Sequence, residues 1–183
     1  MSTRLDTVAE IIDNLRRVFQ VVNAQSKKAE HETGLTGPQL WAIKTIAQEA
    51  PIMVSEIARR MYLHPATVVG ILDRLEKQGL VKRIRSTEDR RVVRVELSER
   101  GQALVKKSPE VAQGLLVAGL ERLSTNKLNS IARALDQMAE ILGAQNIPPQ
   151  LILSPEVNKP YRTVAGAVRA KSAGRRRPTK TKP

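Results

Sequence analysis

The chain has 183 residues, of which 41% are hydrophobic but only 2% aromatic, and it carries a formal net charge of +13. This length suffices for one domain whose core must consist of Leu, Ile, Val and Ala, which favours packed helices over a β-sandwich. The absence of cysteine excludes disulfides, thiolate chemistry and Cys-type zinc sites, and two histidines are too few for a histidine-rich metal cluster. We therefore expect no metal and no cofactor.

The sequence also argues against a signal peptide and a membrane span. Asp6 and Glu10 interrupt the apolar core that a signal peptide would need, and the longest apolar run, residues 115–120, is far too short to cross a bilayer. We therefore expect a cytoplasmic protein with no membrane partner, and the positive charge makes nucleic acid its simplest partner.

The first predicted element is a long amphipathic helix over residues 5–28. Its main apolar residues recur at spacings of three and four; they are Leu5, Val8, Ile12, Leu15, Phe19 and Val22. Apolar residues at positions 11, 18 and 21 widen this stripe. So broad an apolar face needs more than one neighbour, which is either the rest of the same domain or, for part of the stripe, a second chain.

A second helix is predicted from about residue 37 to residue 49. Thr36 can cap it, Pro38 suits its first turn, and Gln39 stands three residues after the cap. Pro51 ends it. Trp41, the only tryptophan, is expected to lie in the core.

Residues 55–101 hold the central pattern. A short helix over residues 55–61 leads through a tight connection into a helix over residues 65–78, with Pro65 at its first position, His64 at its cap and Gly79 at its end. Strand patterns at residues 80–85 and 93–97 then flank a charged turn, and residues 52–54 can form a short extended piece. This order is typical of a winged helix-turn-helix, in which one helix enters the DNA major groove and the hairpin lies against the adjacent backbone.

The helix over residues 65–78 has an inner and an outer side. Val68, Leu72 and Leu75 follow the spacing of a buried stripe. The residues left on the outside are Ala66, Thr67, Gly70, Asp73 and Arg74. A glycine inside a helix is unfavourable by roughly 1 kcal/mol relative to Ala. Either Gly70 allows another backbone to approach closely, or the helix simply tolerates it.

Two long helices are predicted over residues 99–143. Ser98 can cap the first, which runs to about Leu120 with a kink at Pro109; Ser124 can cap the second, which Gly143 closes. Neither carries an enzyme-like polar cluster, and the chain shows no Ser-His-Asp set, phosphate-binding loop or paired carboxylates. We therefore expect no catalytic residues and no enzyme activity.

Residues 147–183 are predicted to form a basic, proline-containing, disordered tail. All 18 acidic residues lie at or before Glu156, whereas nine of the 31 basic residues follow it. Because each neutralised phosphate adds affinity without regard to sequence, such a tail favours nonspecific DNA binding. Its expected DNA contacts are Arg169, Lys171, Arg175, Arg176, Arg177, Lys180 and Lys182.

Three motifs follow one another through the central pattern: DRLEKQGLV ending at Val81, DRR ending at Arg91 and VELSERG ending at Gly101. In this order and spacing they resemble the MarR family of bacterial transcriptional regulators. The resemblance covers about residues 5–145 and implies a mainly α fold with a small β-hairpin wing (α+β). Within a domain of residues 1–146, it implies intertwined dimerisation helices at 5–30 and 99–143 and a winged helix-turn-helix part at 52–98.

The resemblance also implies a function. Family members are homodimers that bind roughly palindromic double-stranded DNA, whose half-sites must match the separation of the two reading helices. We therefore expect a sequence-specific transcriptional regulator, a ligand-responsive repressor associated with the bacterial nucleoid. The alternative is a broadly binding DNA-organising protein that relies on the basic tail.

The resemblance assigns DNA contacts to the helix over residues 65–78 and to the wing. In the wing, Asp89 would brace the hairpin while Arg90 or Arg91 enters the minor groove; alternatively, Arg91 forms an internal ion pair with Asp89. The full expected DNA-binding set is Ser55, His64, Ala66, Thr67, Val69, Gly70, Arg74, Arg85, Arg90 and Arg91.

Two features depart from the family pattern. The helix starting near Ser55 lacks a good cap, since Met53 and Val54 precede it, and many members carry Arg or Thr where this chain has Gly70. Without a long side chain there, base reading leans on Thr67, on contacts between thymine methyls and Ala66 or Val69, and on the wing and DNA shape.

Members of the family often bind small aromatic, anionic effectors between the dimer helices and the winged part. Here such a cleft would involve Phe19, Trp41, Tyr62 and Leu63.

Overall fold

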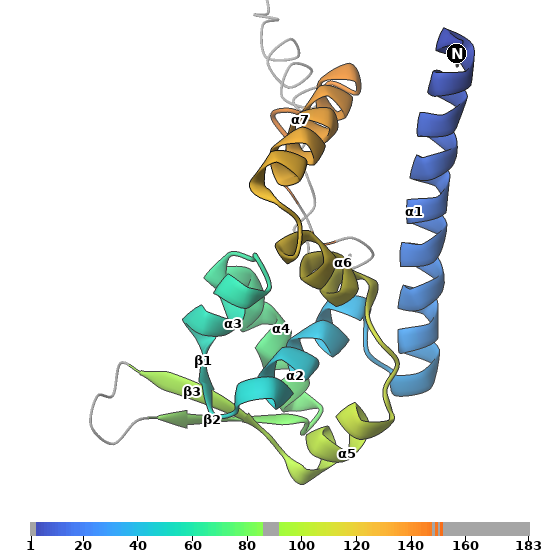
Figure 1. Cartoon of the computed structure of the whole chain (residues 1–183). Helices are drawn as coiled ribbons and strands as arrows, with labels where there is room; N and C mark the ends of the chain where they lie inside the picture. Colours follow the sequence, from blue (N-terminus) through green and yellow to red (C-terminus); the bar gives the residue numbers. More distant parts are fainter. Residues whose placement is uncertain (1–2, 86–91, 148, 150, 152–183) are drawn as a thin grey trace, which may run out of the picture.

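The computed structural model describes residues 3–85, 92–147, 149 and 151. The described part is mostly helical with one small sheet, as predicted (Figure 1). Its helices and strands, in chain order, are α1 (Arg4–Thr33), α2 (Gly37–Glu49), β1 (Ile52–Met53), α3 (Val54–Arg60), α4 (Pro65–Lys77), β2 (Val81–Arg85), β3 (Val93–Leu97), α5 (Glu99–Lys107), α6 (Ala112–Glu121) and α7 (Thr125–Ile141). None of the helices described is long and apolar enough to cross a lipid bilayer.

The core lies where α2, α3 and α4 pack against one another and against the sheet. It is aliphatic, as the composition predicts, and its fully buried side chains include Leu40, Ile43, Ile57, Val68, Ile71, Leu72, Leu75 and Val95. Trp41 differs from the prediction: it is only half-buried and packs on the edge of this core. The reason is that its face of α2 turns towards α6, where the aliphatic core ends.

The sheet has three antiparallel strands in the order β1-β3-β2. Val81 pairs with Leu97 at the base of the hairpin, and Ile52 pairs with Val95 on the other side of β3. The predicted extended piece at residues 52–54 is therefore confirmed at Ile52 and Met53, while Val54 already belongs to α3. The hairpin is the predicted wing, with the tip at residues 86–91 outside the described part.

Helix α1 is longer than the apolar pattern predicts. It begins with a capping box, in which the Thr3 hydroxyl accepts from the Asp6 N–H and the Asp6 carboxylate accepts from the Thr3 N–H. It ends at Gly34, whose φ of +70° is a left-handed conformation that suits glycine. The predicted end at residue 28 is wrong because the apolar stripe stops before the helix does.

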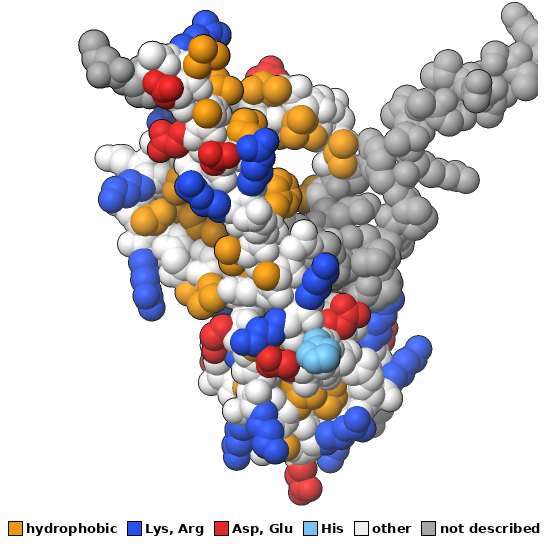
Figure 2. All heavy atoms as spheres, turned by 90° about the vertical axis from the view of Figure 1, so that its right-hand side faces the viewer, with side chains coloured by type: hydrophobic (Ala, Val, Ile, Leu, Met, Phe, Trp, Pro, Cys, Tyr) orange, Lys and Arg blue, Asp and Glu red, His pale blue; other side chains and the backbone are white. Residues whose placement is uncertain are grey.

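Most of α1 lies away from the rest of the chain (Figure 1). Of its residues only Ser26 and Ala29 are buried, both near its C-terminal end. Figure 2 shows the face of the molecule that carries α1, and hydrophobic side chains gather on the upper half of this face. Leu5 is 81% exposed and Phe19 is 60% exposed, so the described part of the chain leaves most of the predicted apolar stripe uncovered.

The segment 99–143 forms three helices and not two. The predicted kink at Pro109 is a complete break, with residues 108–111 between α5 and α6. Proline lacks an N–H and forces the preceding residue out of helical geometry, and Ser108 accordingly has a ψ of 147°. The predicted second helix corresponds to α7, which has no buried residue and extends from the winged part on the same side as α1 (Figure 1).

Candidate nucleic-acid interface

The connection between α3 and α4 is a tight turn. The Tyr62 N–H donates to the Arg59 carbonyl at 3.2 Å and the Leu63 N–H to the Ala58 carbonyl at 2.9 Å. Tyr62 has a φ of +51°, a left-handed conformation that is uncommon for a residue with a side chain. His64 then caps α4, because its Nδ1 accepts from the Ala66 N–H at 3.3 Å. This turn fixes the direction of α4 relative to α3.

Helix α4 has the two sides that the sequence predicts. Val68, Ile71, Leu72 and Leu75 are buried against the core. Of the candidate DNA contacts, Ala66 and Val69 are exposed, whereas Thr67, Gly70 and Arg74 are half-buried. A Cβ added at Gly70 would have no neighbour within 4 Å, so no close approach within the chain requires glycine at this position.

Arg83 of β2 ties the wing to α4. Its Nη2 donates to Asp73 Oδ1 at 2.6 Å and to the Val69 carbonyl at 3.3 Å, and its Nη1 donates to Glu76 Oε2 at 2.9 Å. The guanidinium thus offsets two carboxylates on the helix that would otherwise repel DNA phosphates. Sequence reasoning missed this contact, although a basic residue on the strand after an acidic helix face is a signal for it.

The described part of the wing is basic on its exposed surface. Lys82, Arg85 and Arg94 are exposed, with Arg85 at the end of β2 beside Val93 of β3. The predicted wing residues Asp89, Arg90 and Arg91 lie outside the described residues. The predicted tail contacts from Arg169 to Lys182 lie outside them as well.

A shallow, mainly apolar groove separates α4 from the wing. Its volume is about 560 Å³, and its lining residues are Met53, Val54, Ser55, Pro65, Val69, Arg83, Val92 and Val93. The structure therefore brings Ser55 and Val69, two of the predicted DNA contacts, to one surface. Ser55 is exposed in the first turn of α3.

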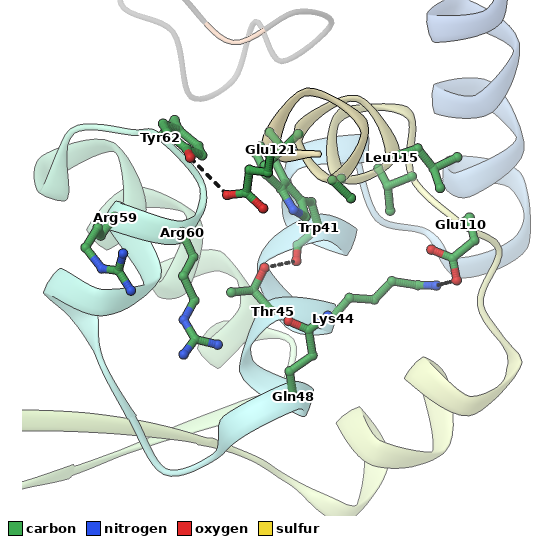
Figure 3. A pocket seen from close by; sticks show the side chains of 14 residues that line it. Trp41, Lys44, Thr45, Gln48, Arg59, Arg60, Tyr62, Glu110, Leu115 and Glu121 are labelled. Carbon is green, nitrogen blue, oxygen red and sulfur yellow. Dashed lines mark hydrogen bonds and ion pairs between the residues drawn. The ribbon is translucent and has the colours of Figure 1, made fainter. Parts of the chain in front are cut away.

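A second cavity, of about 460 Å³, lies between α2, the C-terminal end of α3 and α6 (Figure 3). Trp41 and Tyr62 line it, as predicted for the effector cleft, but the other two candidates do not. Leu63 packs against the core, and Phe19 lies on the uncovered part of α1. Sequence reasoning missed the cationic lining, Lys44, Arg59 and Arg60, of which the Arg59-Arg60 pair was the visible signal.

Two polar contacts bridge this cavity to α6 or the segment just before it (Figure 3). Tyr62 Oη donates to Glu121 Oε1 at 2.9 Å, and Lys44 Nζ donates to Glu110 Oε1 at 3.0 Å. The Glu121 carboxylate raises the pKa of the Tyr62 phenol above its ordinary value of 10.0, because it accepts the phenol's proton in a hydrogen bond. These contacts join the winged part to the helices that follow it.

The cations of this cavity already have carboxylate partners. Arg59 Nη2 lies 2.6 Å from Glu56 Oε1, and this hydrogen bond lowers the pKa of Glu56. Arg60 bonds both Glu56 and Glu49. The cavity therefore combines an aromatic wall with positive charge, and an anionic ligand would have to compete with these carboxylates. The part of the chain that the structure describes holds no cluster of His, Asp and Glu suited to a metal ion.

A helix-turn-helix followed by a basic hairpin, with an exposed face on the second helix, defines a winged helix-turn-helix protein of the DNA-binding class. The family model for MarR matches residues 35–93, which span α2 to the start of β3. The chain is 31% identical over 122 residues to the organic hydroperoxide resistance transcriptional regulator of Bacillus subtilis (strain 168), covering 67% of this chain and 82% of that protein. The chain belongs to the MarR family of helix-turn-helix transcriptional regulators.

Two further comparisons agree with this family. The HTH-type transcriptional repressor MdtR of Bacillus subtilis (strain 168) is 32% identical over 94 residues, which are 51% of this chain and 61% of that protein. The solved structure of reduced AbfR bound to DNA matches with a TM-score of 0.50 at 22% identity, covering 76% of this chain and 99% of that chain. At this identity the structural match supports the fold alone.

Proposed function

We propose that this protein is a homodimeric repressor that binds a palindromic operator in double-stranded DNA and responds to a small aromatic, anionic effector. The observation that carries the proposal is the outer face of α4, which is free of core contacts and stands beside a wing with exposed basic residues. A helix presented in this way fits the DNA major groove, with the wing against the flanking phosphates. Ser55, His64, Ala66, Thr67, Val69, Gly70, Arg74 and Arg85 are the described residues proposed to contact DNA.

Uncovered apolar surface supports the homodimer. Phe19 of α1 is 60% exposed, Leu116 of α6 is 58% exposed and Leu135 of α7 is 57% exposed. A helix as long as α1, with its apolar stripe in water, gains little stability from propensity alone and needs a packing partner. A second copy of the chain offers the same stripes, and a twofold dimer would place two α4 helices for two half-sites.

The cavity beside Trp41 supports a response to a ligand. An aromatic carboxylate could stack on Trp41 and bond Lys44 or Arg59, displacing Glu110 or Glu56 from these cations. Losing the contact between Lys44 and Glu110 would loosen the connection between α2 and the segment before α6. The distance between the two α4 helices of the dimer would then change. Benzoate and the neutral benzamide have a similar shape but differ in charge, so a comparison of their binding tests whether the ligand must be anionic.

The DNA-binding part of the proposal is tested by selecting duplexes from a random pool at near-physiological salt. Full-length protein and a truncation to residues 1–146 are compared. We expect both to recover the same inverted repeat, with the full-length protein binding it more tightly because the tail adds phosphate contacts. Uniform binding of all DNA by the full-length protein, with no selection by the truncation, would instead support the DNA-organising alternative.

A further inference from the structure

The exposed side chains in the first half of α4, the part expected to face the bases, cannot form the bidentate hydrogen bonds that recognise a purine. Arg and Lys read guanine in the major groove, and Asn and Gln read adenine. Positions 65–70, the part of α4 nearest its N-terminus, hold Pro, Ala, Thr, Val, Val and Gly. Of these residues Pro65, Ala66 and Val69 are exposed, and all three side chains are apolar.

Two acidic side chains further along α4 already have a partner in the wing. Asp73 and Glu76 both accept from Arg83 of the wing, at 2.6 and 2.9 Å. Arg74 is half-buried in the second half of the helix. Base-edge contacts must therefore come mainly from the apolar first half of α4.

Gly70 presents no side chain on this face of α4. A Cβ at this position would meet nothing within 4 Å, so the fold itself does not require the glycine. Its effect is to leave no side chain at the position after Val69. Val69, which is 42% exposed, also lines the groove that Met53 and Pro65 border.

We propose that Val69 and Ala66 read the C5-methyl groups of thymines in each half-site, so that this protein selects its operator mainly by apolar contact in the major groove. The methyl group of thymine is the one apolar feature that distinguishes a base pair there. Val69 is the specificity-determining residue of this contact, and Ala66, one turn earlier on the same face, supports it. The inference rests on the proposed function, since it concerns how the same helix reads DNA.

The test replaces each thymine of the selected operator, one at a time, by deoxyuridine. This substitution leaves base pairing unchanged and removes only the methyl group. We expect two positions in each half-site, one for Val69 and one for Ala66, at which Kd rises about fourfold, the change that corresponds to burial of one methyl. Deoxyuridine outside the half-sites is the control and should leave Kd unchanged.

The second part of the test is the variant Val69→Ala with the same duplexes. We expect the rise in Kd at one uridine position to disappear in Val69→Ala, because the contact with that methyl group is already missing. The rise in Kd at the second position should persist in Val69→Ala and disappear in Ala66→Gly. A selected operator whose affinity is insensitive to every uridine would overturn the inference and leave the proposed function intact. A uridine effect of equal size in the wild type and both variants would also overturn it, whereas failure to select any operator would contradict the proposed function itself.

Discussion

At the scale of single residues, two helical glycines with opposite surroundings give a matched test of the structure. Gly70 of α4 has open space where a Cβ would stand, whereas a Cβ at Gly101 of α5 would lie 2.1 Å from the Leu80 carbonyl oxygen. Gly70→Ala should raise the free energy of unfolding by about 1 kcal/mol, the difference in helix propensity. Gly101→Ala should lower it by about 1–3 kcal/mol, because a backbone group must move. Urea denaturation measures both, and equal effects of the two variants would contradict the packing described here.

Residues with local roles were the most predictable from the sequence. His64, Pro65 and Gly79 signal the ends of α4 through hydrogen bonding and backbone geometry that involve only their neighbours. The buried stripe of α4 follows from periodicity in the same way. The placement of Trp41 at the edge of the core could not be predicted, because it depends on where α6 packs after a break in the chain.

At the scale of elements, Arg83 provides a test of how the wing is held. Arg83→Gln should lower the free energy of unfolding by less than about 1 kcal/mol, since its ion pairs are partly exposed. The affinity for the operator should fall on the order of tenfold, because Asp73 and Glu76 lose their neutralising partner beside the DNA. These quantities are measured by urea denaturation and by fluorescence anisotropy.

The salt dependence of binding separates this role from a phosphate contact. Arg83→Gln should leave the slope of log K against log salt unchanged, because the guanidinium bonds the protein and not the DNA. Arg85→Gln, at the exposed position two residues further along β2, is the control and should reduce the slope by about 1. A reduced slope for Arg83→Gln would mean that this side chain contacts phosphate directly.

The hydrogen bond between Tyr62 and Glu121 links α6 to the turn after α3, and its pH dependence has a definite sign. The pKa of Tyr62 is raised in the folded protein because the neutral phenol donates to Glu121. Its contribution to stability is therefore complete below the ordinary value of 10.0 and is lost as the pH rises through the raised pKa. The difference in unfolding free energy between wild type and Tyr62→Phe should shrink as the pH rises from 10.0 through the raised pKa. A difference that does not change over this range would show that the hydrogen bond is absent in solution.

Contacts between elements were predictable only in part. The motif that begins at Asp73 indicates the winged fold. The ion pair between Asp73 and Arg83, however, depends on how the hairpin folds back onto α4. Pro109 predicts a disturbance in a helix, but a kink and a complete break have the same sequence signal. The cavity lined by Lys44, Arg59 and Glu121 joins three elements that are distant in the chain, so no local pattern reveals it.

At the scale of the whole molecule, the uncovered apolar face of α1 predicts self-association. Phe19→Glu should weaken dimerisation at least tenfold, because the carboxylate would be buried without a partner in the interface. Gln20→Glu adds the same charge at the next position, off the apolar stripe, and should leave the dimer intact. Sedimentation equilibrium measures both variants, and a monomeric wild-type protein would refute the assignment of this face.

The most direct test of the central claim is a hydroxyl-radical footprint of the full-length protein on the selected operator. A dimer with one α4 in each half-site should protect two patches related by twofold symmetry, with centres about 10–10.5 base pairs apart or a multiple of that spacing. Protection of a single unsymmetrical patch, or even protection along the whole duplex, would contradict a dimeric, site-specific regulator.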